Sequence, residues 1–296
     1  MAVSAFAQET PARVHRPSSL TGWSWPGIVA WYALMVALVV VMLFPFYWMV
    51  VSSLKTDAEL FELKPTLFPM SPSLGFYERL IVGTPFIRYF VNSGIVALVT
   101  TGLVIVAATL AAYSLARFRF VGREPFALSM LVAQMFPSVL LAIPIFVILS
   151  QLGLLNSFLG LVMAYVTFAL PFCTWMLRGH FMNVPVELEE SAMIDGATRL
   201  GALVRITLPV AAPGIAATAI LGFLLAWNEY LFATVLITQD DLKTLPVGLS
   251  GYISPWFVDY GVLMAGSVMA SVPVIVFFVL VQRYIISGLT AGAVKG

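Results

Sequence analysis

The chain has 296 residues, of which 61% are hydrophobic and only 10% are charged, and its mean hydropathy is +1.00. A soluble domain with so few charges would precipitate, so the composition indicates an integral membrane protein. The net charge of +1 does not indicate a nucleic-acid-binding surface. The single cysteine excludes an internal disulfide, and two histidines far apart in the sequence do not suggest a metal site.

Six apolar segments each reach the length of about 20 residues that a bilayer requires. They are predicted at residues 28–51, 88–115, 125–149, 158–177, 210–237 and 260–284, between a polar segment at 1–27 and a small-residue tail at 285–296. Pro137 and Pro144 interrupt the third. The predicted fold class is therefore an all-α membrane protein with six transmembrane helices, whose spanning domain covers residues 28–284.

Lysine and arginine set the expected orientation, because cytoplasmic loops carry an excess of both. With both termini cytoplasmic, 10 of the 15 basic residues lie inside and 5 outside. This arrangement predicts outer loops at residues 52–87 and 238–259. It also places the segment 183–209 in the cytoplasm.

Residues 183–209 are the one long polar stretch within the apolar part of the chain. Pro185 is a good first residue for a helix, Gly196 should end that helix, Thr198 can cap a second one, and Pro209 should stop it. The spacing predicts a helix–turn–helix with one apolar side. Two interpretations stay open: a simple cytosolic connector, or a surface that docks into a groove of a partner protein.

Glu229 is the one acidic residue inside a predicted span, where a charge is costly and therefore a candidate for function. Trp227, Asn228 and Tyr230 flank it, and aromatic faces beside an amide and a carboxylate suit a sugar ring. Equally, Glu229 can reach the outer interface among aromatic belt residues. Gln134 is a similar, weaker candidate for a translocation path.

The chain contains no Gly-Lys dipeptide and hence no phosphate-binding loop, and it shows no hydrolase motif. We therefore predict that it is not an enzyme. If ATP drives transport, the ATPase is another polypeptide, which would require a docking surface on this one.

The docking stretch resembles the signature of permease subunits of ABC importers, E-A-A, then G, then I-x-L-P. The matching residues are Glu190, Ser191, Ala192, Asp195, Gly196, Ala197, Ile206, Thr207, Leu208 and Pro209. Ser191 in place of the middle alanine is the one visible departure. Asn92-Ser93, the segment AWNEYLFA and the ending GLTAGAVKG are further similar to the carbohydrate-uptake branch, and in particular to the smaller membrane subunit of maltose/trehalose-type importers.

This resemblance implies an ABC importer permease fold in a bacterial or archaeal plasma membrane. The residues implied for ATPase coupling are Glu189, Glu190, Ala192, Asp195, Gly196, Leu200, Ile206, Leu208 and Pro209; those for the path are Gln134, Trp227, Asn228, Glu229 and Tyr230; those for contact with the binding protein are Ser250, Gly251 and Tyr252. The tail from residue 288 would reach toward the ATPase. The implied partners are an ATPase dimer carrying ATP and Mg²⁺, a second homologous permease, an extracytoplasmic sugar-binding protein and lipid.

Three functions are thus compared. The favoured one is a permease subunit that imports a sugar, of di- or oligosaccharide size, by ATP-driven alternating access. The second is a stand-alone proton- or ion-coupled carrier with Glu229 as the coupling site. The third is a membrane scaffold with no transport path.

Overall fold

The computed structural model describes residues 25–254 and 258–293, with side chains described up to residue 280 and at residue 282. Within these residues the regular structure is helical, apart from one isolated antiparallel β-bridge between Ile253 and Val258. The predicted amino-terminal segment lies outside the described residues up to residue 24. The prediction of an all-α chain is confirmed.

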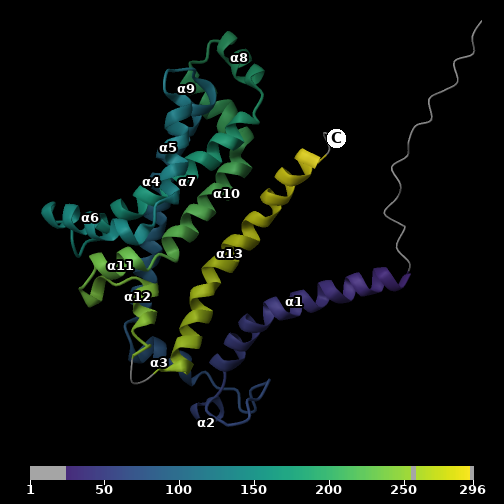
Figure 1. Ribbon diagram of the computed structural model, residues 1–296, viewed down its shortest axis with the longest axis vertical. Helices are drawn as coiled ribbons and strands as arrows, with labels where there is room; N and C mark the ends of the chain where they lie inside the picture. The colour runs from purple at the N-terminus through teal and green to yellow at the C-terminus, as the bar shows by residue number, and fades with distance from the viewer. Residues whose placement is uncertain (1–24, 255–257, 294–296) are drawn as a thin grey trace, which may run out of the picture. The chain divides into compact units, whose positions relative to one another are not determined.

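Within the described residues five helices are long and apolar enough to cross a membrane, and a bent pair brings the number to six if the pair is counted as one span (Figure 1). The five are α1 (Trp25–Ser53), α4 (Phe86–Arg117), α7 (Phe158–Met182), the continuous helical run Arg199–Trp227 and the apolar part of α13 (Tyr260–Ala293). The pair is α5 (Arg123–Met135) and α6 (Ser138–Gln151). The predicted six spans correspond to these elements.

The bend between α5 and α6 is 99°. It falls at Phe136 and Pro137, both of which have extended backbone angles. A residue that precedes proline is disfavoured in the helical region, so the chain leaves α5 there and starts again at Ser138. The predicted interruption at Pro137 is confirmed, whereas Pro144 lies inside α6 without ending it.

The chain divides into two compact units, residues 1–48 and 49–296. The described part of the first is the amino-terminal portion of α1, whose side chains are mostly exposed and apolar. A helix that is apolar on all sides is suited to lipid rather than water.

The core of the second unit lies where α4 packs against α7 and against α10 (Leu208–Trp227). Ala97, Ala108 and Ala112 on α4 are fully buried and allow the helix backbones to approach closely. Phe181 on α7 is also fully buried. These three helices form the frame that holds both ends of the unit.

Shorter helices lie in the predicted outer loops. Residues 52–87 contain α2 (Asp57–Leu60) and α3 (Gly75–Gly83), and residues 238–259 contain η2 (Asp240–Leu242) and α12 (Leu245–Ser250). The first of these loops packs on α13, because the ring of Phe76 lies where a Cβ on Gly261 would stand. The described part of each loop therefore contains helical structure.

The fifth predicted span differs from the structure at both ends. Pro209 does not stop a helix: a π-helical turn, η1 (Leu203–Thr207), leads directly into α10, and the amide of Leu208 donates to the carbonyl of Leu203. Proline is tolerated in the first turn of a helix, and here the π turn has already shifted the hydrogen-bond register. At the other end the helix stops at Trp227, three non-helical residues follow, and α11 (Leu231–Leu236) begins after them.

The sixth predicted span ends later than expected, since α13 continues as a helix to Ala293. The small residues of the predicted tail, 285–296, therefore extend this helix as far as its last described residue. Alanine is the best helix former, which favours this continuation.

The second unit has two distinct ends. One holds α8 (Val186–Ile194) beside the last turn of α4, and the other holds α12 beside the first turns of α4. We call them the α8 end and the α12 end. At about 1.5 Å per residue, the length of α4 separates them by more than the roughly 30 Å core of a bilayer.

Candidate functional site

The site begins with α8 and the sharp turn that ends it. The amide of Ala197 donates to the carbonyl of Ala192 at 2.9 Å, and the amide of Gly196 donates to the carbonyl of Met193 at 3.1 Å. This pair of bonds is the Schellman arrangement of a helix end, in which the residue at the turn takes a left-handed conformation. Gly196 has φ +90° and fills that position. The predicted helix end at Gly196 is confirmed, and the helix itself begins one residue after Pro185.

The second arm of the hairpin starts at Thr198. Its hydroxyl accepts a hydrogen bond from the amide of Gly201 at 3.1 Å, so it caps α9 (Arg199–Ala202) as predicted. The helix then runs through η1 into α10. The turn is thus joined through continuous helix to the apolar run Arg199–Trp227.

A buried ion pair ties the hairpin to α4. The Arg117 Nε atom lies 2.8 Å from Glu189 Oε1, and the two side chains are only 6% and 4% exposed. Thr207 donates to the same Glu189 oxygen at 2.7 Å, and Tyr113 donates to the other at 2.9 Å. Arg117 also donates to the carbonyl of Val184 at 2.9 Å. One carboxylate therefore joins α8 to α4 and to η1.

The hydrogen bonds around Glu189 favour its ionised form. Burial alone raises its pKa, but the hydrogen bonds from Thr207, Arg117 and Tyr113 outweigh burial and hold the pKa below the usual range. A buried pair of this kind gives little net stability compared with an apolar pair, yet losing one partner leaves an unpaired buried charge. The joint therefore depends on both members of the pair.

The outer surface of the hairpin carries most of the residues predicted for ATPase coupling. Glu190, Asp195, Gly196, Leu200 and Pro209 are exposed, while Ala192, Ile206 and Leu208 are partly buried. Ile194, which was not among the predicted residues, is the most exposed apolar side chain of α8 at 86%. Exposed apolar and acidic groups thus alternate over one small surface.

Glu189, which was predicted for ATPase coupling, does not lie on the exposed surface of the hairpin. It points into the bundle, because Glu189, Ala192 and Met193 share the inward face of α8 at helical spacing, and none of the three is fully exposed. The spacing of Glu189 relative to the apolar residues Ala192 and Met193 was the sequence signal that could have placed it on the inward face of the helix. Of its partners, Thr207 belongs to the signature but was given no role, and Arg117 and Tyr113 were not predicted for the site.

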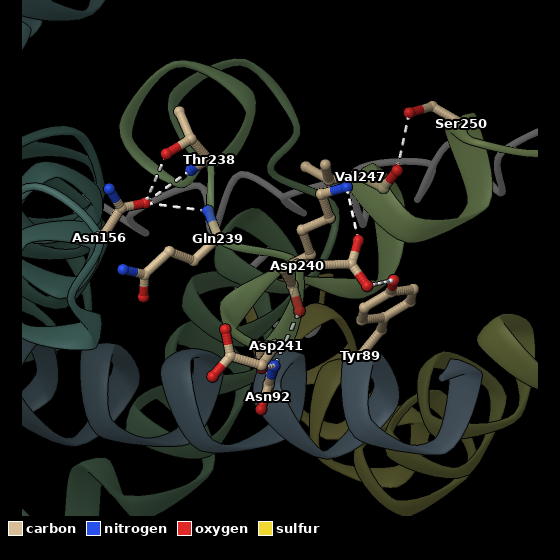
Figure 2. A network of polar contacts seen from close by, with 10 residues as sticks. Tyr89, Asn92, Asn156, Thr238, Gln239, Asp240, Asp241, Val247 and Ser250 are labelled. Carbon is tan, nitrogen blue, oxygen red and sulfur yellow. Dashed lines mark hydrogen bonds and ion pairs between the residues drawn. The ribbon is translucent and has the colours of Figure 1, made fainter. Parts of the chain in front are cut away.

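At the α12 end, a polar network holds the segment 238–245 against α4 (Figure 2). Asn92 donates to the carbonyls of Asp241 and Lys243, both at 2.9 Å. Tyr89 donates to Asp240 Oδ2 at 2.9 Å, and Lys243 pairs with Asp240 Oδ1 at 2.8 Å. The hydrogen bonds from Lys243 and Tyr89 lower the pKa of Asp240. The exposed carboxylate of Asp241 is therefore presented on a fixed backbone.

Asn156 holds the same segment from the other side (Figure 2). Its Oδ1 atom accepts from the amide and hydroxyl of Thr238, at 2.7 and 3.0 Å, and from the amide of Gln239, at 3.1 Å. Asn156 has φ +52°, a left-handed conformation that asparagine tolerates well. It therefore fixes both the turn before α7 and the loop after α11.

We expect Asn156→Ala to loosen residues 238–241, because it removes three hydrogen bonds and strains the left-handed backbone by about 1–2 kcal/mol. Asn156→Gly relieves the strain only, and Asn156→Asp keeps the acceptor oxygen. Amide hydrogen exchange across 238–244 should rise in the order Asp, Gly, Ala. Equal protection in all three variants would show that Asn156 does not hold the loop.

The residues predicted for a translocation path lie around the break between α10 and α11. Trp227 is 3% exposed and packs in the core, where its Nε1 atom donates to the carbonyl of Ala270 at 3.2 Å. Asn228 and Tyr230 are exposed. The Glu229 carboxylate accepts from the first amides of α11, at 2.9 and 3.1 Å. In this structure Glu229 therefore caps a helix beyond the end of the span, which accounts for a carboxylate in an apolar run.

Gln134 is linked to this break through Phe168. Its side-chain amide donates to the carbonyl of Phe168 at 2.8 Å, and the ring of Phe168 stacks on that of Phe232 at 4.8 Å. Phe232 is the residue whose amide bonds Glu229. The structure thus brings Gln134 and Glu229 to the same aromatic pair.

The predicted contact loop of Ser250, Gly251 and Tyr252 begins at the last residue of α12. Ser250 closes the helix end by donating to the carbonyl of Val247 at 2.8 Å, and Gly251 is exposed. Tyr252 is half-buried and donates to the hydroxyl of Thr84 at 2.9 Å. The loop is anchored at its tyrosine and accessible at its glycine.

The described residues thus form a bundle of membrane-length helices, with an anchored helical hairpin at one end and polar loops held against α4 at the other. Residues 104–290 match the family described as binding-protein-dependent transport system inner membrane component, and the chain belongs to this family. It is accordingly a multi-pass protein of the inner membrane, and its transport depends on a binding protein.

Individual relatives agree with this assignment. The chain is 41% identical to the sulfoquinovosyl glycerol transport system permease protein SmoH of Agrobacterium fabrum, over 86% of this chain and 89% of that one. It is 37% identical to the diacetylchitobiose uptake system permease protein DasC of Streptomyces coelicolor, over 94% and 99%. A crystal structure of a bacterial ABC transporter that imports alginate superposes with a TM-score of 0.75 at 25% identity, covering 88% of this chain and 98% of that one.

Proposed function

We propose that this chain is one of two permease subunits of an ABC importer that moves a di- or oligosaccharide into the cytoplasm. ATP and Mg²⁺ are bound by a separate ATPase dimer, a second homologous permease completes the path, and a sugar-binding protein delivers the substrate. The observation that carries the proposal is the hairpin 183–209, which is exposed on its outer surface and anchored to two membrane-spanning helices. The sugars named for the relatives SmoH and DasC support the substrate class.

In this proposal the α8 end faces the cytoplasm, in agreement with the distribution of lysine and arginine. Glu190, Asp195, Ile194 and Leu200 lie in a cleft of the ATPase, a docking mode in which a short helix fills a groove. Closure of the ATPase around ATP moves the hairpin as one body. The movement passes to α4 through Arg117 and to α10 through the continuous helix.

The α12 end then faces outward and meets the sugar-binding protein. Gly251 and the exposed segment 238–241 are the contacts we assign to it. Because coupling between two sites is reciprocal in free energy, docking at this end must favour ATPase closure at the other. Asn228 and Tyr230 border the path at the break after α10, together with Gln134.

The test is transport by the assembled complex in proteoliposomes with ATP enclosed. We expect sugar uptake that requires the binding protein and internal ATP and that persists when an uncoupler removes the proton gradient. Glu229→Gln should leave this requirement unchanged. Uptake by the chain alone that collapses with the uncoupler would instead favour a proton-coupled carrier that uses Glu229. A complex without substrate-dependent ATPase stimulation would favour a scaffold.

A further inference from the structure

The turn between α4 and α5, residues 118–122, carries an unusual combination of side chains. Arg119, Phe120 and Val121 are all exposed, and Val121 is completely so. A shallow cavity of about 390 Å³ lies beside them, lined by Arg119, Phe120, Gly122, Arg123, Glu124 and Pro125. The turn joins the ends of two spans, so it lies at the depth of the lipid headgroups.

Positive charge is in excess at this cavity. The single carboxylate of Glu124 is shared between Arg123, whose Nε atom is 3.2 Å away, and Arg178, whose Nη2 atom is 3.2 Å away. Within the described residues Arg119 makes no ion pair. Three guanidinium groups thus share one acid, and their remaining donors suit an anion with several oxygens.

The exposed apolar side chains around the cavity indicate which kind of anion it suits. Phe120 is 47% exposed, and Trp175, under the guanidinium of Arg178 at 5.3 Å, is 38% exposed. Along α5, Phe126 and Leu128 continue an exposed apolar surface away from the arginines. A phosphate with acyl chains attached would satisfy both parts, whereas a free phosphate or an acidic peptide would leave the apolar surface uncovered.

We propose that Arg119 and Arg123 bind the phosphate of an anionic phospholipid, with Phe120 and Val121 among the acyl chains. This site is at the same end of α4 as Arg117 but uses none of the residues of the buried joint. It would keep the last turn of α4 at a fixed depth in the membrane, which matters because α4 carries the anchor of the hairpin.

The test uses the assembled transporter, with lipid binding measured by native mass spectrometry after exchange into mixed phosphatidylglycerol and phosphatidylcholine nanodiscs. We expect Arg119→Gln with Arg123→Gln to lower the preference for phosphatidylglycerol by roughly fivefold per arginine, so by roughly 25-fold in all. The matched control is Lys64→Gln with Arg88→Gln, which removes two exposed charges from other parts of the chain and should change nothing.

Further variants keep the proposal open to refutation if the double variant folds poorly. Arg119→Gln alone removes an exposed side chain without an ion pair and should give the fivefold loss, and Phe120→Ser should weaken retention while both arginines remain. An unchanged preference in Arg119→Gln would overturn the proposal. Displacement of the lipid by millimolar inorganic phosphate would also overturn it. The same holds if the arginine variants lose the ATPase from the complex while lipid binding is unchanged.

Discussion

Arg117→Met is expected to destabilise the hairpin strongly, because it leaves the Glu189 carboxylate buried without its cation. Breaking a buried pair by removing one member costs about 3–5 kcal/mol, whereas losing an exposed charge costs little. The variant should show a lower unfolding midpoint in detergent. Amide exchange across residues 184–195 should rise more than exchange elsewhere.

Arg205→Met is the matched control for this prediction. Arg205 lies in η1 at the same end of the unit, is exposed and makes no ion pair within the described residues. Its removal should change the free energy of unfolding by no more than about 0.5 kcal/mol. A small effect of Arg117→Met, equal to that of Arg205→Met, would show that the ion pair does not hold the hairpin.

A double variant separates the charge from the packing. With Arg117→Met and Glu189→Met together, no unpaired charge remains, and replacing a buried pair by apolar groups is often neutral or stabilising. We therefore expect the double variant to be more stable than Arg117→Met alone. If the double variant instead loses as much free energy of unfolding as the two single variants together, the two side chains act independently.

The partners of Glu189 show where sequence reasoning stops. The elements with local signals were predicted: the turn at Gly196, the cap at Thr198 and the break at Pro137 are each set by one residue and its neighbours. Arg117 lies 72 positions before Glu189, and nothing in the spacing of either helix identifies the other. In the sequence, Arg117 was counted simply as one of the cytoplasmic charges that set the orientation.

The segment from Val210 to Ile237 shows a second limit. Its apolar composition is continuous, so a single span was predicted, yet the helix ends at Trp227 and restarts at Leu231. The Glu229 carboxylate decides the difference by capping the new helix. The sequence predicted Glu229 to be a costly charge inside a span. In the structure it accepts two backbone hydrogen bonds at the start of α11 and so acts as a helix cap.

Gly196→Pro is expected to abolish transport by the assembled complex while the protein remains inserted in the membrane. Proline fixes φ near −65°, far from the observed +90°, and it removes the amide that donates to Met193. The cost of about 3 kcal/mol or more would disfavour the native turn by roughly 100-fold or more. ATPase activity should persist without responding to the loaded binding protein, because the spans do not depend on the turn for folding.

Two further variants grade this effect. Gly196→Ala keeps the amide and meets no neighbouring atom, so it should cost about 1–2 kcal/mol for the left-handed backbone and reduce uptake only in part. Gly179→Ala, in the interior of α7 and also without a neighbour within 4 Å, is the control and should be neutral. Normal, binding-protein-stimulated uptake by a stably assembled Gly196→Pro complex would mean that the shape of the hairpin does not transmit the ATPase movement, because that variant cannot form the observed turn.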